Sequence, residues 1–324
     1  MTTKEKLEEM LTESGNDYIS GNAIAERLGI TRAAVWKNIL QLREEGYDIE
    51  AVTNRGYRLS DTNDVVSTES IRKYLGDEAG SYPLEVLKET VSTNSLMKER
   101  AESLPEWFTL IAGSQSGGRG RSGRSFYSPP GTGVYISIIQ RPSIPADQAT
   151  RITTAAAVAA CRAIEECSDS KAVIKWVNDV FVNGKKVCGI LTEASFNMES
   201  GTLDWAVMGI GFNVYEPEGG FPGEIARTAG PIVKEKQKDL RSRIAASFMK
   251  HFRLVCANLN KPDFYEEYRN RSFIIGRRIN VLKGSETQPA TAIEIDDECR
   301  LIVRYDNGRE ETLSSGEVSI RPVQ

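Results

Sequence analysis

Histidine is almost absent from this chain of 324 residues, which contains a single one, His251. A Ser-His-Asp triad and a histidine-rich zinc site are therefore not expected to carry its chemistry. His251 lies in a segment with helical character, and we predict a structural role for it. If the chain is an enzyme, it must work with Lys, Arg, Asp, Asn and backbone groups.

Long apolar runs and paired cysteines are also missing. No apolar stretch approaches the roughly 18 residues that a transmembrane helix needs, and residues 1–10 carry two Lys and three Glu with no apolar core. We therefore expect a cytoplasmic protein with no signal peptide and no membrane partner. The five cysteines form no C-x-x-C pair, which predicts reduced thiols rather than a disulfide frame or a zinc site.

The overall charge gives no general attraction to nucleic acid. A hydrophobic fraction of 40% and a charged fraction of 27% are typical of a soluble globular protein. The net charge of -4 means that any contact with nucleic acid must come from a local basic patch. The length predicts two or three domains, and the pattern of elements favours three, with boundaries 1–62, 63–273 and 274–324.

The first 60 residues have the pattern of a winged helix. Ser20 and Thr31 are expected to cap the second and third helices, and Gly29 to end the second. Two short helices joined by a glycine turn form a helix-turn-helix, and a hairpin of two short strands follows. The expected helices are 4–13, 22–28 and 31–45, and the strands are 48–52 and 57–59. The polar segment 61–70 has the composition of a linker.

Charge is segregated within this N-terminal unit. Residues 31–43 contain Arg32, Lys37 and Arg43 and no acid, whereas the first helix is acidic. This distribution fits a recognition helix in the major groove of DNA and a wing on the backbone. The expected DNA contacts are Thr31, Arg32, Trp36, Lys37, Asn38 and Arg55. Two alternatives stay open: a winged helix that contacts only protein, and a core position for Trp36.

The region from 71 to about 270 mixes helices and strands. Adjacent strand hairpins predict an antiparallel or mixed sheet, and hence an α+β fold rather than a doubly wound one. The expected helices are 147–166, 239–257 and 262–271, and the strands are 172–177, 180–182 and 186–194. Beyond Gly276, five short strands predict a small β-barrel. These strands are 278–282, 290–295, 300–305, 310–313 and 318–321.

A glycine- and arginine-rich segment, 118–124, is the most unusual feature of the middle region. Its three glycines match G-x-G-x-x-G, the dinucleotide fingerprint, but a Pro-Pro pair soon follows and prevents the helix that this fingerprint requires. We therefore predict a mobile loop between two strands that orders around a carboxylate or phosphate. The anion would be held by Arg119, Arg121 and Arg124. A basic surface loop that contacts nucleic acid is the alternative.

Two strand-like segments favour the anion-binding interpretation. Asn178 and Asp179 lie together at a strand end, which is a natural position for a metal ion and phosphate. Lys186 lies two residues beyond an Asn-Gly turn on a regular strand, which is a rigid mount for a catalytic cation. No Walker motif occurs, so any ATP must be bound in another way.

Taken together, these motifs resemble those of biotin–protein ligases, in the three-domain form that doubles as a repressor of biotin genes. The resemblance spans the whole chain and depends on the order of its motifs. They are Ser92-Thr93-Asn94, Gln115, 118–124, 175–179 and 186–191. Val177 departs from the proline usual in K-W-P-N-D. The family implies a central fold similar to class II aminoacyl-tRNA synthetases and an SH3-like C-terminal barrel.

The resemblance implies roles for individual residues. Biotin would contact Ser92, Thr93, Asn94, Gln115, Gly118, Arg119, Gly120, Arg121, Lys186 and Gly189. ATP or the adenylate would contact Arg124, Phe126, Lys175, Asn178, Asn213 and Arg321. Lys186, Arg121 and Asp179 would form the catalytic group, with Asp179 placing Mg²⁺. Phe126 stands where some members have a tryptophan near adenine, and it lacks the indole donor.

The implied reaction joins the carboxylate of biotin to ATP, and then passes biotin from biotinyl-AMP to a lysine of a carrier protein. The implied partners are the biotin carboxyl carrier protein of acetyl-CoA carboxylase, operator DNA, and a second copy of the chain in a ligand-promoted homodimer. Three alternatives stay open. They are a lipoate–protein ligase, a biotin-sensing repressor without ligase activity, and a ligase whose winged helix no longer represses.

Overall fold

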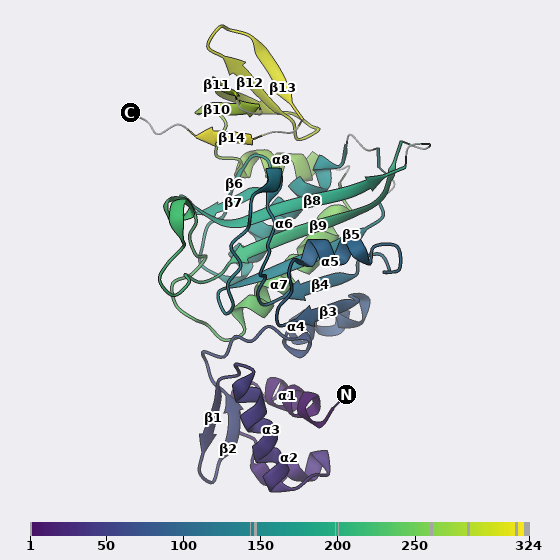
Figure 1. Ribbon diagram of the computed structural model, residues 1–324, viewed down its shortest axis with the longest axis vertical. Helices are drawn as coiled ribbons and strands as arrows, with labels where there is room; N and C mark the ends of the chain where they lie inside the picture. Colours follow the sequence, from purple (N-terminus) through teal and green to yellow (C-terminus); the bar gives the residue numbers. More distant parts are fainter. Residues whose placement is uncertain are drawn as a thin grey trace.

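The computed structural model describes residues 2–142, 144–145, 148–197, 199, 201–259, 262–283, 286–314 and 317–320. Its elements gather around sheets of two, seven and five strands. These three groups follow one another along the long axis of the molecule, from the N-terminal helices to the last strands (Figure 1). Among the described residues, no helix combines the length and the apolar composition needed to cross a membrane.

The N-terminal group is the predicted winged helix. The side chains of Ser20 and Thr31 accept hydrogen bonds at the starts of the second and third helices, and both predicted N-caps are confirmed. Gly29 ends the second helix with a left-handed φ of 66°, as predicted. The elements are α1 Thr3–Glu13, α2 Gly21–Leu28, α3 Arg32–Glu44, β1 Ile49–Val52 and β2 Gly56–Leu59.

The segment 61–70 is not simply a linker, and that prediction is wrong in two respects. Its last residues begin helix α4 (Thr68–Leu75), which Ser67 caps. Asp64 is buried and pairs with Arg241 at 2.9 Å, where helix α7 (Leu240–Cys256) begins. A buried carboxylate requires such a partner, but the partner lies 177 residues away in the chain. Local composition could not reveal it.

Seven strands form the central sheet, in the order β3-β4-β5-β9-β8-β7-β6. Only β3 and β4 run parallel, so the predicted mixed sheet is confirmed. The predicted tight turn before Lys186 is also present, with positive φ at Asn183 and Gly184. The strands are β3 Leu84–Leu87, β4 Thr109–Ala112, β5 Gly133–Gln140, β6 Val173–Lys175, β7 Asp179–Val182, β8 Lys185–Phe196 and β9 Leu203–Asn213.

The two faces of this sheet have different partners, because side chains alternate along each strand. On β5 and β9, even-numbered residues such as Ile136 and Met208 pack in the main core with α6 (Thr150–Cys167) and α7. On the same two strands, odd-numbered residues such as Ile139 and Val207 pack with Met97 of α5 (Thr93–Glu99). The short helix α5 thus covers one face and the long helices cover the other (Figure 1).

The observed helices follow the predicted ones closely. Helix α6 begins at Thr150, three residues after the predicted start, while α7 is one residue shorter at each end and α8 spans Pro262–Arg271. Helices α4 and α5 and strands β3 and β9 were not predicted, and the strand expected before the arginine- and glycine-rich loop, β4, was given no bounds. Helices α4 and α5 are short, and α5 contains Thr93 and Asn94, whose polarity gives no strong helical pattern.

The C-terminal group is an antiparallel sheet of five strands in the order β13-β12-β11-β10-β14. Its connection to the centre includes a hydrogen bond of 2.9 Å from the Trp176 indole to the Cys299 carbonyl. Closure into a barrel stays a prediction, because no ladder joins β13 to β14 among the described residues. The strands are β10 Arg278–Lys283, β11 Glu286–Ile295, β12 Leu301–Tyr305, β13 Glu310–Leu313 and β14 Glu317–Ile320.

The rare residue types have structural positions. His251 lies 2.7 Å from a carboxylate oxygen of Glu166, so it joins α7 to α6, and its predicted structural role is confirmed. All five cysteines are free thiols, and four of them are buried. Burial raises the pKa of Cys161 to about 12, which keeps this thiol protonated and unreactive.

Candidate functional site

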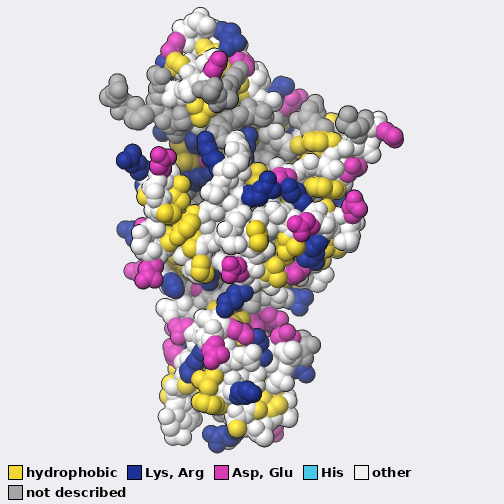
Figure 2. All heavy atoms as spheres, in the orientation of Figure 1, with side chains coloured by type: hydrophobic (Ala, Val, Ile, Leu, Met, Phe, Trp, Pro, Cys, Tyr) yellow, Lys and Arg dark blue, Asp and Glu magenta, His cyan; other side chains and the backbone are white. Residues whose placement is uncertain are grey.

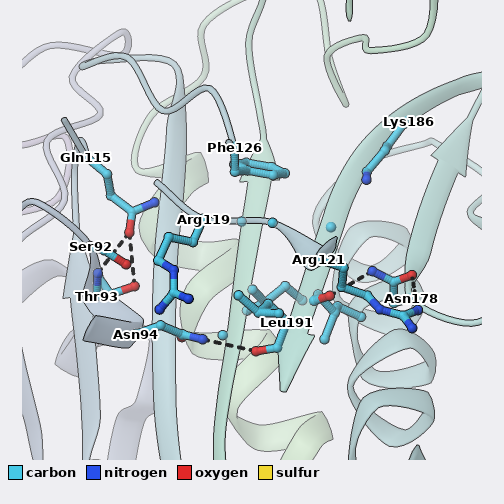
Figure 3. A pocket seen from close by; sticks show the side chains of 16 residues that line it. Ser92, Thr93, Asn94, Gln115, Arg119, Arg121, Phe126, Asn178, Lys186 and Leu191 are labelled. Carbon is cyan, nitrogen blue, oxygen red and sulfur yellow. Dashed lines mark hydrogen bonds between the residues drawn. The ribbon is translucent and has the colours of Figure 1, made fainter. Parts of the chain in front are cut away.

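A pocket opens on the α5 face of the central sheet (Figure 3). Its walls come from the start of α5, from the loop between β4 and β5, and from β8 and β9. The lining residues are Ser92, Thr93, Asn94, Gln115, Arg119, Gly120, Arg121, Phe126, Asn178, Lys186, Gly189, Ile190, Leu191, Gly209, Ile210 and Gly211. Residues from motifs far apart in the sequence therefore meet in one cavity.

One end of the pocket is built from neutral hydrogen-bonding groups. Gln115 Oε1 accepts from the Thr93 backbone N–H at 2.9 Å and from the Thr93 hydroxyl at 3.2 Å. The other side of this amide, Nε2, donates to the Ser128 hydroxyl at 3.0 Å. Ser92 caps α5. This end offers donors and acceptors at fixed positions and suits a polar, uncharged ligand group.

Asn94 has a different position from its neighbours in the motif. Its Nδ2 donates to the Leu191 carbonyl and to the Glu193 carboxylate, each at 3.1 Å. Its Oδ1 accepts from the Ser137 hydroxyl at 2.6 Å. The amide is buried and its hydrogen-bonding groups are occupied by protein. Asn94 therefore fixes the start of α5 on the sheet.

Glycines form the floor of the pocket. A Cβ placed on Gly209 would lie 2.0 Å from Asn94 Oδ1, and one on Gly211 would lie 2.5 Å from the Phe126 ring. A Cβ on Gly189 would also meet that ring, at 2.9 Å. Real Cβ atoms do not approach so closely, so these positions need glycine for space rather than for backbone freedom.

The segment 118–124, here called the arginine loop, covers the pocket. It contains one short 3-10 turn, Arg121–Gly123, and strand β5 rather than a helix follows it, so the predicted loop between two strands is confirmed. Phe126 packs edge-on against Tyr135 with ring centroids 6.3 Å apart. Gly118, the first residue of the loop, is buried, and a Cβ placed on it would lie 2.4 Å from the Phe126 carbonyl oxygen. Packing thus anchors the base of the loop.

Charged groups define the other end of the pocket. The Lys186 ammonium lies 2.6 Å from Asp179 Oδ1, across the β7–β8 hairpin. Arg121 donates to Asn178 Oδ1 at 3.2 Å, and Asn178 Nδ2 donates to the Ile190 carbonyl at 2.8 Å. Figure 3 shows Lys186, Arg121 and Asn178 together, across the cavity from Gln115 and Thr93. Two cations and one carboxylate meet here, an arrangement suited to an anionic ligand.

Five described residues expected at this site do not line the pocket, and Asp179, the partner of Lys186, is one of them. Gly118 and Arg124 belong to the arginine loop, Lys175 is paired in register with Asp179, and Asn213 donates to the Lys186 carbonyl at 3.5 Å. Arg321 lies outside the described residues.

Three predicted DNA contacts are exposed on α3. They are Arg32, Trp36 and Lys37. Trp36 is 56% exposed, so a core position for it is excluded. Figure 2 shows Lys and Arg side chains at the far tip of the N-terminal unit, and acidic side chains together with further basic ones near its junction with the centre.

The other three residues of that predicted set have partners within the protein. Thr31 caps α3, and the Asn38 amide donates to the Ala34 carbonyl at 2.8 Å. The Arg55 guanidinium lies 4.2 Å from the centre of the Tyr18 ring. The contact with Tyr18 orients Arg55 on the wing, while Arg32, Trp36 and Lys37 remain exposed on α3.

Sequence reasoning missed several residues that build the pocket. Ser137 is fully buried in the apolar strand β5, and such a lone hydroxyl signals a polar partner. Gly209 and Gly211 form a Gly-x-Gly pattern within a strand, which signals close approach by another group. Glu193 accepts from Asn94 and Lys98 and was not singled out. Its signal is weak, because its partners lie about a hundred residues away in the chain.

Three family models match the chain in succession. A helix-turn-helix domain matches residues 3–58, the biotin/lipoate A/B protein ligase family matches residues 85–213, and the biotin protein ligase C-terminal domain matches residues 274–321. Among solved structures, the biotin protein ligase from Aquifex aeolicus in complex with biotin and ATP is similar, with a TM-score of 0.61 and 26% identity. That similarity covers 74% of this chain and 98% of the Aquifex chain.

Full-length relatives extend the similarity across the whole sequence. The bifunctional ligase/repressor BirA of Bacillus subtilis (strain 168) is 35% identical over 315 residues, which is 95% of each chain. BirA of Escherichia coli (strain K12) is 30% identical over 201 residues, covering 62% of this chain and 61% of that protein. With a helix-turn-helix, a ligase fold and a ligase C-terminal domain in the same order, the chain belongs to the BirA family of bifunctional ligase/repressors.

Proposed function

We propose that this chain is an ATP-dependent biotin–protein ligase. The observation that carries the proposal is the two-ended pocket, with neutral hydrogen-bonding groups around Thr93 and Gln115 and cations from Lys186 and Arg121 opposite. Biotin has matching ends, a neutral ureido ring and a carboxylate. Its ring would face Ser92, Thr93 and Gln115, and its carboxylate would face Lys186. Asn94 would act by holding α5 in place.

The proposed reaction has two steps, and neither needs a histidine. A carboxylate oxygen of biotin bonds to the α-phosphorus of ATP, and the bond between that phosphorus and pyrophosphate breaks. A carrier lysine amine then bonds to the acyl carbon, AMP leaves with the bridging oxygen, and the amine loses a proton. Negative charge develops on phosphate oxygens in the first step, where Lys186 and Arg121 stabilise it. The arginine loop excludes water from the mixed anhydride.

Mg²⁺ fits this proposal through Asp179. Among the described residues no group of three or more His, Cys, Asp or Glu side chains could hold a metal, so this site is no all-protein cage. Mg²⁺ is commonly bound by one or two carboxylates and the phosphates of its nucleotide. The carboxylate of Asp179, at the edge of the pocket, suits that mode. The ion would supply charge neutralisation at the phosphates.

The proposed contacts with the adenylate follow from where each residue lies relative to the pocket. Phe126 and Asn178 line the pocket and would lie near the nucleotide. Arg124, Lys175 and Asn213 would act from the pocket margin, and Arg321 would reach it from the C-terminal region. The proposed carrier is the biotin carboxyl carrier protein of acetyl-CoA carboxylase, which would place the reaction in the cytoplasm.

Biotin-dependent exchange of labelled pyrophosphate into ATP tests the first step. Exchange that requires biotin supports the proposal, and exchange driven by lipoate alone would indicate a lipoate–protein ligase instead. If neither acid supports exchange but biotin still changes the affinity for DNA, the chain would be a repressor without ligase activity. The same sample should show a raised melting temperature with biotin and ATP, because a ligand that binds only the folded state stabilises it.

We also infer that the winged helix binds operator DNA and represses in response to biotinyl-AMP. The exposed residues Arg32, Trp36 and Lys37 on α3 favour this second function. So few cations predict modest affinity for one chain, and a ligand-promoted homodimer would double the contacts. A gel shift with operator DNA should therefore strengthen with biotinyl-AMP and with protein concentration. If no shift occurs either with or without biotinyl-AMP, only the ligase function would remain.

A further inference from the structure

Glu193 lies at the meeting point of three parts of the pocket wall. It stands on β8, and its side chain reaches α5. Its carboxylate accepts from Lys98 Nζ at 2.6 Å and from Asn94 Nδ2 at 3.1 Å, both on α5. It also pairs with Arg119 Nη1 of the arginine loop at 3.2 Å. One carboxylate thus joins the sheet, the helix and the loop.

The charges at this meeting point favour an ionised Glu193. Burial raises the pKa of its carboxyl, but the hydrogen bonds from Lys98 and Asn94 outweigh burial and leave the pKa below its usual value. The Glu193 side chain is 21% exposed, whereas the Arg119 side chain is 47% exposed. The anion is therefore held firmly by the wall, while its partner Arg119 lies on the more exposed arginine loop.

We propose that Glu193 is a positioning residue that holds the arginine loop over the pocket through Arg119. The contact brings the loop to the wall that contains Asn94, so Arg119 spans the neutral end of the cavity (Figure 3). Glu193 itself does not line the pocket and acts through Arg119. The effect of this contact on ligand binding rests on the proposed biotin ligase function. The effect of the contact on the loop is independent of that function.

Limited trypsin digestion tests the loop directly, because the enzyme cleaves after arginine and needs a locally mobile chain. Fragments cut at Arg119, Arg121 and Arg124 are quantified by mass spectrometry in Glu193→Gln and wild type. The amide keeps the size of the side chain and one acceptor oxygen for Lys98 or Asn94, but it loses the second acceptor and the charge that pairs with Arg119. We expect cleavage to become faster by about threefold to fivefold, the range of a partly exposed ion pair. Equal rates would overturn the proposal.

Two further variants separate positioning from simple loss of structure. Glu85→Gln is the matched control, since Glu85 accepts from Arg100 at the end of α5 at 2.7 Å and has no contact with the loop. Its cleavage rate should equal that of wild type. Arg119→Lys keeps the charge and the protease site but loses the planar fork, so it should loosen the loop as Glu193→Gln does. Additive effects in the double variant would contradict a shared contact.

The biotin KM in pyrophosphate exchange gives the functional readout. Glu193→Gln should raise this KM more than it lowers kcat, because a loosened loop weakens binding before it alters the reacting groups. An unchanged KM with faster cleavage would overturn the functional half of the inference. If wild type shows no biotin-dependent exchange while the cleavage difference persists, the proposed function fails and the loop contact stands.

Discussion

The Lys186 ammonium and the Asp179 carboxylate lie 2.6 Å apart across the β7–β8 hairpin. In the proposed reaction, Lys186 would bind the phosphate and the biotin carboxylate, whereas Asp179 would bind Mg²⁺. Each neutralises the other in the structure described, so ligand binding must replace this pair with new partners on both sides. The hairpin turn at Asn183 and Gly184 fixes their separation. Predictions for each group follow from this pairing.

Replacing Lys186 should abolish most of the adenylation rate. Lys186→Ala removes the cation that would meet the developing charge, and we expect a fall of about a hundredfold or more in biotin-dependent pyrophosphate exchange. Lys185→Ala is the matched control, because Lys185 is exposed and its ammonium donates to the Arg227 carbonyl outside the pocket. Exchange that survives in Lys186→Ala would remove Lys186 from the mechanism.

Asp179→Asn should change the response to Mg²⁺ more than the response to biotin. The amide keeps the size of the side chain but loses the charge that attracts the cation. We expect the Mg²⁺ concentration for half-maximal exchange to rise, with a smaller effect on the biotin KM. A titration of Mg²⁺ at saturating biotin measures this. An unchanged midpoint would show that Asp179 pairs with Lys186 and does not bind Mg²⁺.

The glycine floor should not tolerate a methyl group. A Cβ at position 209 would lie 2.0 Å from Asn94 Oδ1, so Gly209→Ala must displace the amide that fixes α5. Such overpacking costs about 1–3 kcal/mol, and calorimetry should show biotin affinity reduced by about tenfold or more. Gly80→Ala provides the control, since nothing lies within 4 Å of its added Cβ. Equal affinities for the two variants would contradict the packing argument.

On the DNA side, Lys37→Ala should weaken operator binding with little dependence on sequence. An exposed lysine on α3 is expected to meet phosphate, and its loss should reduce the slope of log K against log salt by about one per chain. Lys6→Ala removes an exposed lysine from the acidic helix α1 and should leave the slope unchanged. Fluorescence anisotropy at several salt concentrations distinguishes them. Identical slopes would argue for a winged helix that contacts only protein.

Glu267 gives a prediction about pH and stability. Burial raises the pKa of this carboxyl, but hydrogen bonds from Arg162 and Arg271 outweigh burial and leave it below its usual value. A lowered folded pKa stabilises the protein above the unfolded value of about 4.3, and the effect is lost as pH falls through the folded pKa.

Glu267→Gln should therefore lower the free energy of unfolding at neutral pH, by about 2 kcal/mol. The difference from wild type should shrink as pH falls below the unfolded value and through the lower folded pKa of Glu267, below which both side chains are uncharged. Urea denaturation at several pH values measures it. Glu310→Gln makes a suitable control, since its pair with Arg304 is exposed and should contribute little. A difference that persists unchanged in acid would show that packing, not charge, is responsible.

Much of the fold was predictable because its signals are local. The caps Ser20 and Thr31 and the turn at Asn183 each depend on residues within a few positions, and all three are present. The burial of Asp64 was not predictable, because its partner Arg241 is distant in the chain. Short elements such as α5 also escaped, since tertiary contacts rather than helical periodicity stabilise them.

The pocket shows the same division. Lys186, Arg121 and Asn178 could be anticipated, because their chemistry is visible in the motifs. Ser137 gave only the signal of a lone hydroxyl in an apolar strand, and Glu193 gave almost none, because their importance lies in the partners that folding brings to them. A sequence identifies the groups that meet the ligand more easily than the groups that hold them in position.

Transfer of biotin to a carrier lysine tests the central claim most directly. Wild-type protein is mixed with ATP, Mg²⁺, a biotin carboxyl carrier protein and equal amounts of biotin and lipoate, and the intact carrier is weighed by mass spectrometry. We predict that each carrier gains one biotinyl group, only when ATP is present, and that Lys186→Ala transfers almost none. A carrier that gains lipoate instead, or that remains unmodified by folded wild-type protein, would contradict the claim.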